Sequence, residues 1–168
     1  MMSKLTFSKK TWYSAVLVAS LCSLVNAVAV LIGWPVGILD MVSFALFGIS
    51  LLFLAAGQPA KQRRKVYFGC FLVLMASWIF GDVPGMLAAA AAWPLFVLTV
   101  SREGRDDLRR PLPLLAGAEL LHLAFALAGI YGSTVFQFWA NLLWLLDVMT
   151  RVACAYVLVK GMPAEERS

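Results

Sequence analysis

Six apolar segments constrain the fold of this chain more than any other feature of its sequence. They cover residues 13–33, 36–56, 66–81, 83–100, 112–132 and 134–159. A helix rises about 1.5 Å per residue, so about 20 apolar residues cross the hydrocarbon core of a bilayer. The third and fourth segments are shorter, and they would cross only with local thinning or form a partly inserted hairpin. We expect an all-α membrane protein, a bundle of about six transmembrane helices in one domain over residues 1–168.

Composition supports the same class. Hydrophobic residues make up 62% of the 168 positions and charged residues 14%, whereas soluble domains usually have about 25% charged residues. The cysteines at positions 22, 70 and 154 each lie alone in an apolar run. They are interpreted as small packed or lipid-facing side chains, and neither a disulfide framework nor a metal centre is predicted.

The basic residues indicate how the helices are oriented. Apart from Arg151, every lysine and arginine lies before the first segment, between the second and third, between the fourth and fifth, or after the sixth. The positive-inside rule then places both termini in the cytoplasm, with three helical hairpins in the inner membrane of a bacterial cell. The net charge of +5 is therefore expected to face anionic lipid, and no nucleic acid is expected as a partner.

Polar residues inside the last two segments are the candidate site. In "AELLH", Glu119 and His122 are three residues apart, and in "LDVMTR", Asp147 and Arg151 are four apart. Each spacing puts both side chains on one helix face, so Asp147 and Arg151 are expected to form an ion pair. Trp144 lies one helical turn from Asp147 and is either a lining residue of the same cavity or part of the core.

Folding these two segments about a turn near Gly132 matches the depths of the two carboxylates. Glu119 lies about 13 residues from the turn and Asp147 about 15, so they differ by only about 3 Å along the axis. Two carboxylates beside one arginine leave a surplus negative charge, which a proton or a bound cation would neutralise. Groups that change protonation inside a membrane are typical of proton relays and coupling sites.

A second polar pair is predicted in the first hairpin. Asn26 and Asp40 lie at similar distances from the turn near Trp34 and are expected to hydrogen-bond across it. A hydrogen bond between membrane helices contributes about 1 kcal/mol, so helix attachment is the simpler interpretation of this pair.

Three functions are compatible with these residues. The first is a small transporter or permease subunit that binds a proton or solute between the fifth and sixth helices. The second is a non-catalytic assembly or stabilising subunit of a homo- or hetero-oligomeric membrane complex, with the same residues acting only as helix contacts. The third is an intramembrane enzyme that uses Glu119, His122 and Asp147. The chain has one histidine, and a di-metal helical site normally needs two Glu-x-x-His pairs, so no metal or cofactor is predicted, nor any catalytic residue.

The three functions predict different surroundings for the polar residues. An open cavity that reaches Asp147 would favour transport, a dry and fully paired network would favour the structural subunit, and a metal at His122 would favour the enzyme. The stretches "WPVGI" (34–38) and "WANLLWLLD" (139–147) are similar to stretches in bacterial nicotinamide riboside transporters. This resemblance implies a small transporter and assigns no role to any residue.

Overall fold

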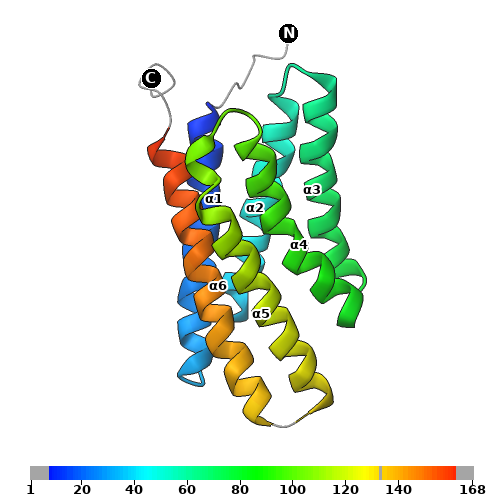
Figure 1. Cartoon of the computed structure of the whole chain (residues 1–168), viewed down its shortest axis with the longest axis vertical. Helices are drawn as coiled ribbons and strands as arrows, with labels where there is room; N and C mark the ends of the chain where they lie inside the picture. The colour runs from blue at the N-terminus through cyan, green and yellow to red at the C-terminus, as the bar shows by residue number, and fades with distance from the viewer. Residues whose placement is uncertain (1–7, 133, 162–168) are drawn as a thin grey trace.

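A computed structural model describes residues 8–132 and 134–161 of the chain, and in these residues it contains helices and no strand. The expected six helices are present (Figure 1): α1 (Lys9–Leu31), α2 (Gly37–Ala56), α3 (Lys61–Ile79), α4 (Asp82–Ser101), α5 (Pro111–Tyr131) and α6 (Thr134–Lys160). A 3-10 turn, η1 (Asp106–Leu108), lies between α4 and α5. The chain termini, which are expected in the cytoplasm, lie outside the described residues.

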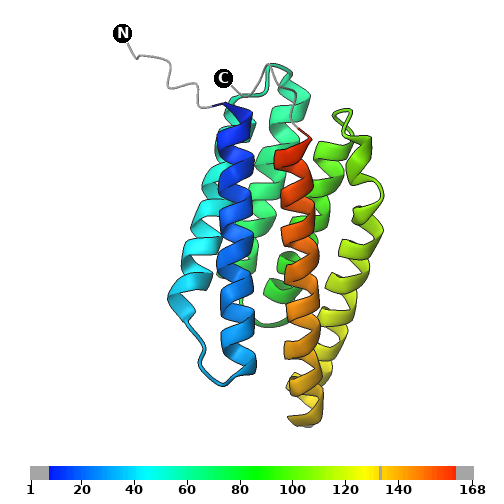
Figure 2. The ribbon, with the colours of Figure 1, turned by 90° about the vertical axis from the view of Figure 1, so that its left-hand side faces the viewer.

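The helices run alternately up and down and close into a ring. Each helix packs against the next one along the chain, and α6 also packs against α1. Figures 1 and 2 show the start of α1, the end of α6 and the α2–α3 and α4–α5 connections at one end of the bundle. We call this the basic end, because the basic residues between positions 61 and 110 lie in the start of α3 and in the α4–α5 connection.

Five of the six helices are long and apolar enough to span a membrane: α1, α2, α4, α5 and α6. Large apolar side chains such as Ile79, Leu114 and Leu120 are mostly exposed on the outside of the bundle, where lipid would cover them. These features indicate a membrane location. The exception is α3, which begins at Lys61 and not near residue 66 as the apolar pattern predicts, because the basic residues before Val66 are themselves helical.

The buried apolar core lies toward the basic end. Phe47 of α2 stacks on Trp93 of α4 with ring centroids 4.5 Å apart, and Phe96 packs edge-on against both. Leu108 of η1 is fully buried against this core. The α4–α5 connection is therefore part of the packed structure.

Arg105 attaches the same connection to α6. Its guanidinium donates hydrogen bonds to the carbonyls of Val157 and Leu158, at 2.7 and 3.1 Å, and pairs with Asp107 at 2.8 Å. The last carbonyls of a helix lack intrahelical donors, so Arg105 supplies a donor to Leu158 and a second one to Val157, which also accepts from the N–H of Gly161. Its positive charge opposes the negative end of the helix dipole. The basic loop thus stabilises the end of α6 in addition to any effect of its charge on orientation.

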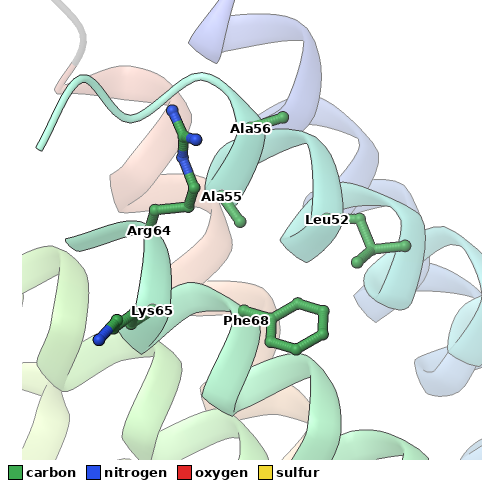
Figure 3. Close-up of a pocket in the computed structure, with 6 residues that line it drawn as sticks. All are labelled: Leu52, Ala55, Ala56, Arg64, Lys65 and Phe68. Atoms are coloured by element: carbon green, nitrogen blue, oxygen red, sulfur yellow. The ribbon is translucent and has the colours of Figure 1, made fainter. Parts of the chain in front are cut away.

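A groove of about 450 Å³ opens on the outside of the bundle between α2 and α3, near the basic end. Figure 3 shows the residues that line it, which are Leu52, Ala55 and Ala56 of α2 and Arg64, Lys65 and Phe68 of α3. The groove combines an apolar wall with two cationic side chains.

Candidate functional site

Arg151 lies between two buried carboxylates. Its Nη2 atom is 2.6 Å from Asp147 Oδ2, one turn earlier on α6, and 2.8 Å from Glu119 Oε1 on α5. The Arg151 Nε–H also donates to Glu119 Oε1 at 3.0 Å. The side chains of Asp147 and Glu119 are 0% and 2% exposed, and that of Arg151 is 15% exposed. We call Glu119, Asp147 and Arg151 the ion cluster.

Helix geometry explains how three residues from two segments meet. The α5–α6 pair has the most extensive contact of any two helices in the bundle, which holds the two carboxylates at the depths expected from their distances to the turn. Side chains on a helix point back toward its N-terminus. Arg151 therefore reaches down to the level of Asp147, where it also meets Glu119. The spacing of Asp147 and Arg151 predicts their ion pair, but it does not reveal that the arginine also pairs with α5.

Asp147 has an incomplete set of partners. Its Oδ2 lies close to Arg151, yet within the described residues neither of its oxygens accepts a hydrogen bond of ordinary geometry. A fully buried carboxylate usually has several hydrogen-bond donors, because removal from water without them is costly. When both carboxylates are ionised, the ion cluster has one negative charge more than Arg151 neutralises, and Asp147 keeps oxygen lone pairs that no donor of the described residues occupies.

His122 completes the candidate set on α5. Single ligand atoms of Glu119, His122 and Asp147 all lie within 4.8 Å of one another. A small pocket of about 90 Å³ adjoins them, between Met86 and Ala90 of α4 on one side and Glu119, His122 and Arg151 on the other. Asp147 is not among its lining residues, so the pocket reaches the ion cluster through Glu119 and Arg151. A cavity of this size is large enough for water.

The net charge of the ion cluster is balanced by one bound positive charge and not by two. Glu119 and Asp147 together supply two negative charges, and Arg151 already supplies one positive charge a few ångströms from both. A proton or a monovalent cation makes the ion cluster neutral, whereas a divalent metal would leave it positive beside a fixed guanidinium. The arrangement is therefore suited to a proton or a monocation.

The tryptophan beside the ion cluster is Trp93 of α4, which sequence reasoning did not identify. Its ring centroid lies 5.9 Å from Arg151 Cζ, within the range of a cation–π contact. Trp144 is half-buried on α6 and makes no ring or charge contact with the described part of the chain. No spacing signal links the fourth segment to Arg151, so the contact with Trp93 depends on the ring closure of the helices.

The structure also brings Asn26 and Asp40 together. Asn26 Nδ2 donates to Asp40 Oδ2 at 2.6 Å, and Asn26 Oδ1 accepts from the backbone N–H of Val36 at 2.8 Å. One turn along the pair, the hydroxyls of Ser23 and Ser43 are 2.7 Å apart. Asn26 is 2% exposed and attaches α1 both to α2 and to the turn between them.

No family model, curated protein or solved structure matches this chain.

Proposed function

We propose that this protein is a small transporter or permease subunit in which the ion cluster binds a proton or a small solute between α5 and α6. The observation that supports the proposal is the sharing of one arginine by two buried carboxylates. Their surplus negative charge is unfavourable in a low-dielectric interior. A bound proton or solute would remove the surplus and would make the packing of α5 against α6 depend on occupancy.

Each residue has a distinct role in this proposal. Glu119 and Asp147 are the titrating or solute-binding groups, and Arg151 is the fixed positive charge that permits one of them to remain ionised. His122 faces the adjoining pocket and relays protons between water in that pocket and Glu119. Ionisable residues inside membrane helices most often serve such pathways.

The proposed setting is the cytoplasmic membrane of a bacterium, with the basic end of the bundle in the cytoplasm. Support comes from the position of the basic α2–α3 and α4–α5 connections at one end of the ring. Clusters of lysine and arginine in short loops remain on the cytoplasmic side during insertion.

Infrared difference spectroscopy of the protein in lipid vesicles tests the proton site. The carboxyl signals of wild type and Glu119→Gln are compared over a pH titration, with the exposed loop variant Asp106→Asn as the control. Asp147 and Arg151 of α6 and His122 of α5 are the charged or titratable groups nearest to Glu119. We expect a carboxyl signal that Glu119→Gln removes and Asp106→Asn leaves unchanged, together with loss of proton release from the vesicle-bound protein. A spectrum that is the same in wild type and Glu119→Gln would contradict the proposal.

One observation favours the structural subunit as the second candidate. The two contacts from Arg151 to Glu119 join α5 to α6, and such a contact is sufficient to hold a hairpin together. In that function, Glu119→Gln keeps a side chain of nearly the same shape and changes only stability. The titration separates the two functions, because a purely structural pair takes up and releases no proton over the range in which the bundle stays folded.

A further inference from the structure

A lateral groove leads from the outside of the bundle to Glu119. It lies between α4 and α5 and has a volume of about 330 Å³. Ala90, Ala91 and Pro94 form one wall, and Ala116, Glu119 and Leu120 contribute to the other. Leu87 and Leu120, which also line it, are 51% and 65% exposed, so the groove opens on the apolar surface that lipid would cover.

The sequence explains why this seam is open. Small side chains on both walls leave space that larger side chains would fill, and α4 and α5 have the least extensive contact of any two successive helices. Pro94 lies inside α4 and has no N–H, so the carbonyl of Ala90 receives no helical hydrogen bond from that position. Ala90 lines both this groove and the small pocket beside Arg151.

The groove is negatively charged where Glu119 lines it whenever that carboxyl is ionised. Glu119 is the one ionisable side chain among the described residues that line it, and it belongs to an ion cluster with one surplus negative charge. The groove thus combines an apolar lining with one acidic residue, Glu119, and with Ala90, whose carbonyl lacks the helical donor that Pro94 cannot supply. These features complement an alkyl chain that ends in a group with N–H donors and a single positive charge.

We infer that the groove admits the alkyl chain of a membrane-dissolved primary amine and that the ammonium group binds Glu119. Such cationic amphiphiles would be the substrate class. Their role as substrates rests on the proposed function, whereas their binding to the groove is independent of it. The ammonium replaces the proton at Glu119, so the ion cluster remains neutral and the amine enters from the lipid without crossing an aqueous opening.

The α2–α3 groove supplies an internal comparison (Figure 3). It is similarly open and apolar, but its charged lining residues are Arg64 and Lys65. Simple partition of an amphiphile into any surface groove would therefore not distinguish the two, whereas a charge-selective site would bind a cation between α4 and α5 and disfavour it between α2 and α3.

Photolabelling of the protein in phosphatidylcholine nanodiscs tests the inference. The probe is dodecylamine with a diazirine at the end of its chain, and the labelled peptides are identified by mass spectrometry. We expect label on the α4 and α5 peptides, with dodecylamine competing about tenfold better than dodecanol, since a charged hydrogen bond contributes about 1.5 kcal/mol or more. Equal competition by the amine and the alcohol would overturn the inference.

Matched variants distinguish loss of binding in the groove from loss of label caused by misfolding. Ala116→Phe should fill the α4–α5 groove and remove the label, and Glu119→Gln should reduce it about tenfold. Ala56→Phe places the same side chain in the α2–α3 groove and should leave the label unchanged. Thermal unfolding of each variant shows whether it is folded, and label that persists in folded Ala116→Phe would also overturn the inference.

The failure of this inference differs from the failure of the proposed function. If wild type shows no titrating Glu119 carboxyl but still binds the amine in a charge-dependent way, the proton-coupled function is wrong and the binding site stands. An intact titration with labelling that ignores the charge of the probe would leave the proposed function and remove the cationic amphiphile as its substrate.

Discussion

Arg151 of α6 binds Glu119 of α5 through two nitrogens, with Nη2 and Nε at 2.8 and 3.0 Å from the same carboxylate oxygen. This contact joins α5 to α6. The second contact of Arg151, with Asp147, lies within α6 and joins no two helices. The spacing of four residues explains how an arginine and an aspartate enter the membrane together. Only the interhelical contact makes the arginine a shared partner and creates the surplus negative charge.

We predict that Arg151→Ala is the most destabilising single change in the ion cluster. It leaves two buried carboxylates without a cation, and loss of one partner of a buried pair typically costs about 3–5 kcal/mol. Arg151→Ala combined with Asp147→Ala should melt at a higher temperature than Arg151→Ala alone, and adding Glu119→Gln should raise it again. Thermal unfolding in detergent measures the series. Equal melting of the single and multiple variants would mean that these charges do not interact.

We also predict that Asn26 stabilises the α1–α2 hairpin. Asn26→Leu leaves Asp40 and the N–H of Val36 without their partner. Hydrogen bonds between membrane helices contribute about 0.6–1.7 kcal/mol, so we expect a loss of about 1 kcal/mol in unfolding free energy. Val25→Ala is the control, because Val25 is 58% exposed on the same helix and should change stability little. Equal effects of both variants would show that the Asn26 hydrogen bonds contribute nothing.

The sequence predicts the helices well because the bilayer imposes a length and a polarity on each of them. The positions of the six helices follow from the apolar runs, and the depth match of Glu119 and Asp147 follows from their distances to one turn. The helical basic start of α3 is the part that hydropathy misses, because an apolar pattern cannot distinguish a charged helical turn from a charged loop.

Contacts between segments that are distant in the sequence were not predictable in the same way. The contact of Arg151 with Trp93, and the attachment of Arg105 to the end of α6, depend on which helices become neighbours when the ring closes. Segment length and charge do not specify those neighbours. The α4–α5 groove is a further case, since the run of alanines at 88–92 is equally compatible with close packing and with an open seam.

Arg105 and Asp107 should make the basic end sensitive to acid. The hydrogen bond from Arg105 holds the pKa of Asp107 below its usual value, so this aspartate binds protons more weakly in the folded protein than in the unfolded chain. Its contribution to stability is therefore present above the unfolded pKa of about 4 and is lost as the pH falls through the folded value. The effect is modest, because Asp107 is 41% exposed.

Melting temperatures recorded between neutral and acidic pH test this prediction. Asp107→Asn should lower the melting temperature at neutral pH and reduce its fall on acidification. Arg105→Ala should have a larger effect at neutral pH, because it also removes two hydrogen bonds to the end of α6. A fall on acidification that is identical in wild type and Asp107→Asn would contradict the role of this pair.

The last prediction concerns whether α3 crosses the membrane. Its apolar part, from Val66 to Phe80, is about 22 Å long at 1.5 Å per residue, which is shorter than a hydrocarbon core of about 30 Å. The turn between α3 and α4 also ends short of the α1–α2 turn and of the neighbouring ends of α5 and α6 (Figure 1). We nevertheless expect α3 to cross, because α4 is long enough to span and both basic connections lie at the same end.

Labelling of single cysteines in intact cells with a membrane-impermeant maleimide tests the crossing. The background replaces the three native cysteines, and the new cysteines are Pro35→Cys, Gln62→Cys, Pro84→Cys and Arg110→Cys, all at exposed positions. Pro35→Cys and Pro84→Cys should react from outside, whereas Gln62→Cys and Arg110→Cys should react only after the cells are permeabilised. If Pro35→Cys reacts from outside and Pro84→Cys does not, the α3–α4 hairpin enters and leaves on one side. External reaction of Arg110→Cys would instead mean that α5 and α6 have the opposite orientation in the membrane.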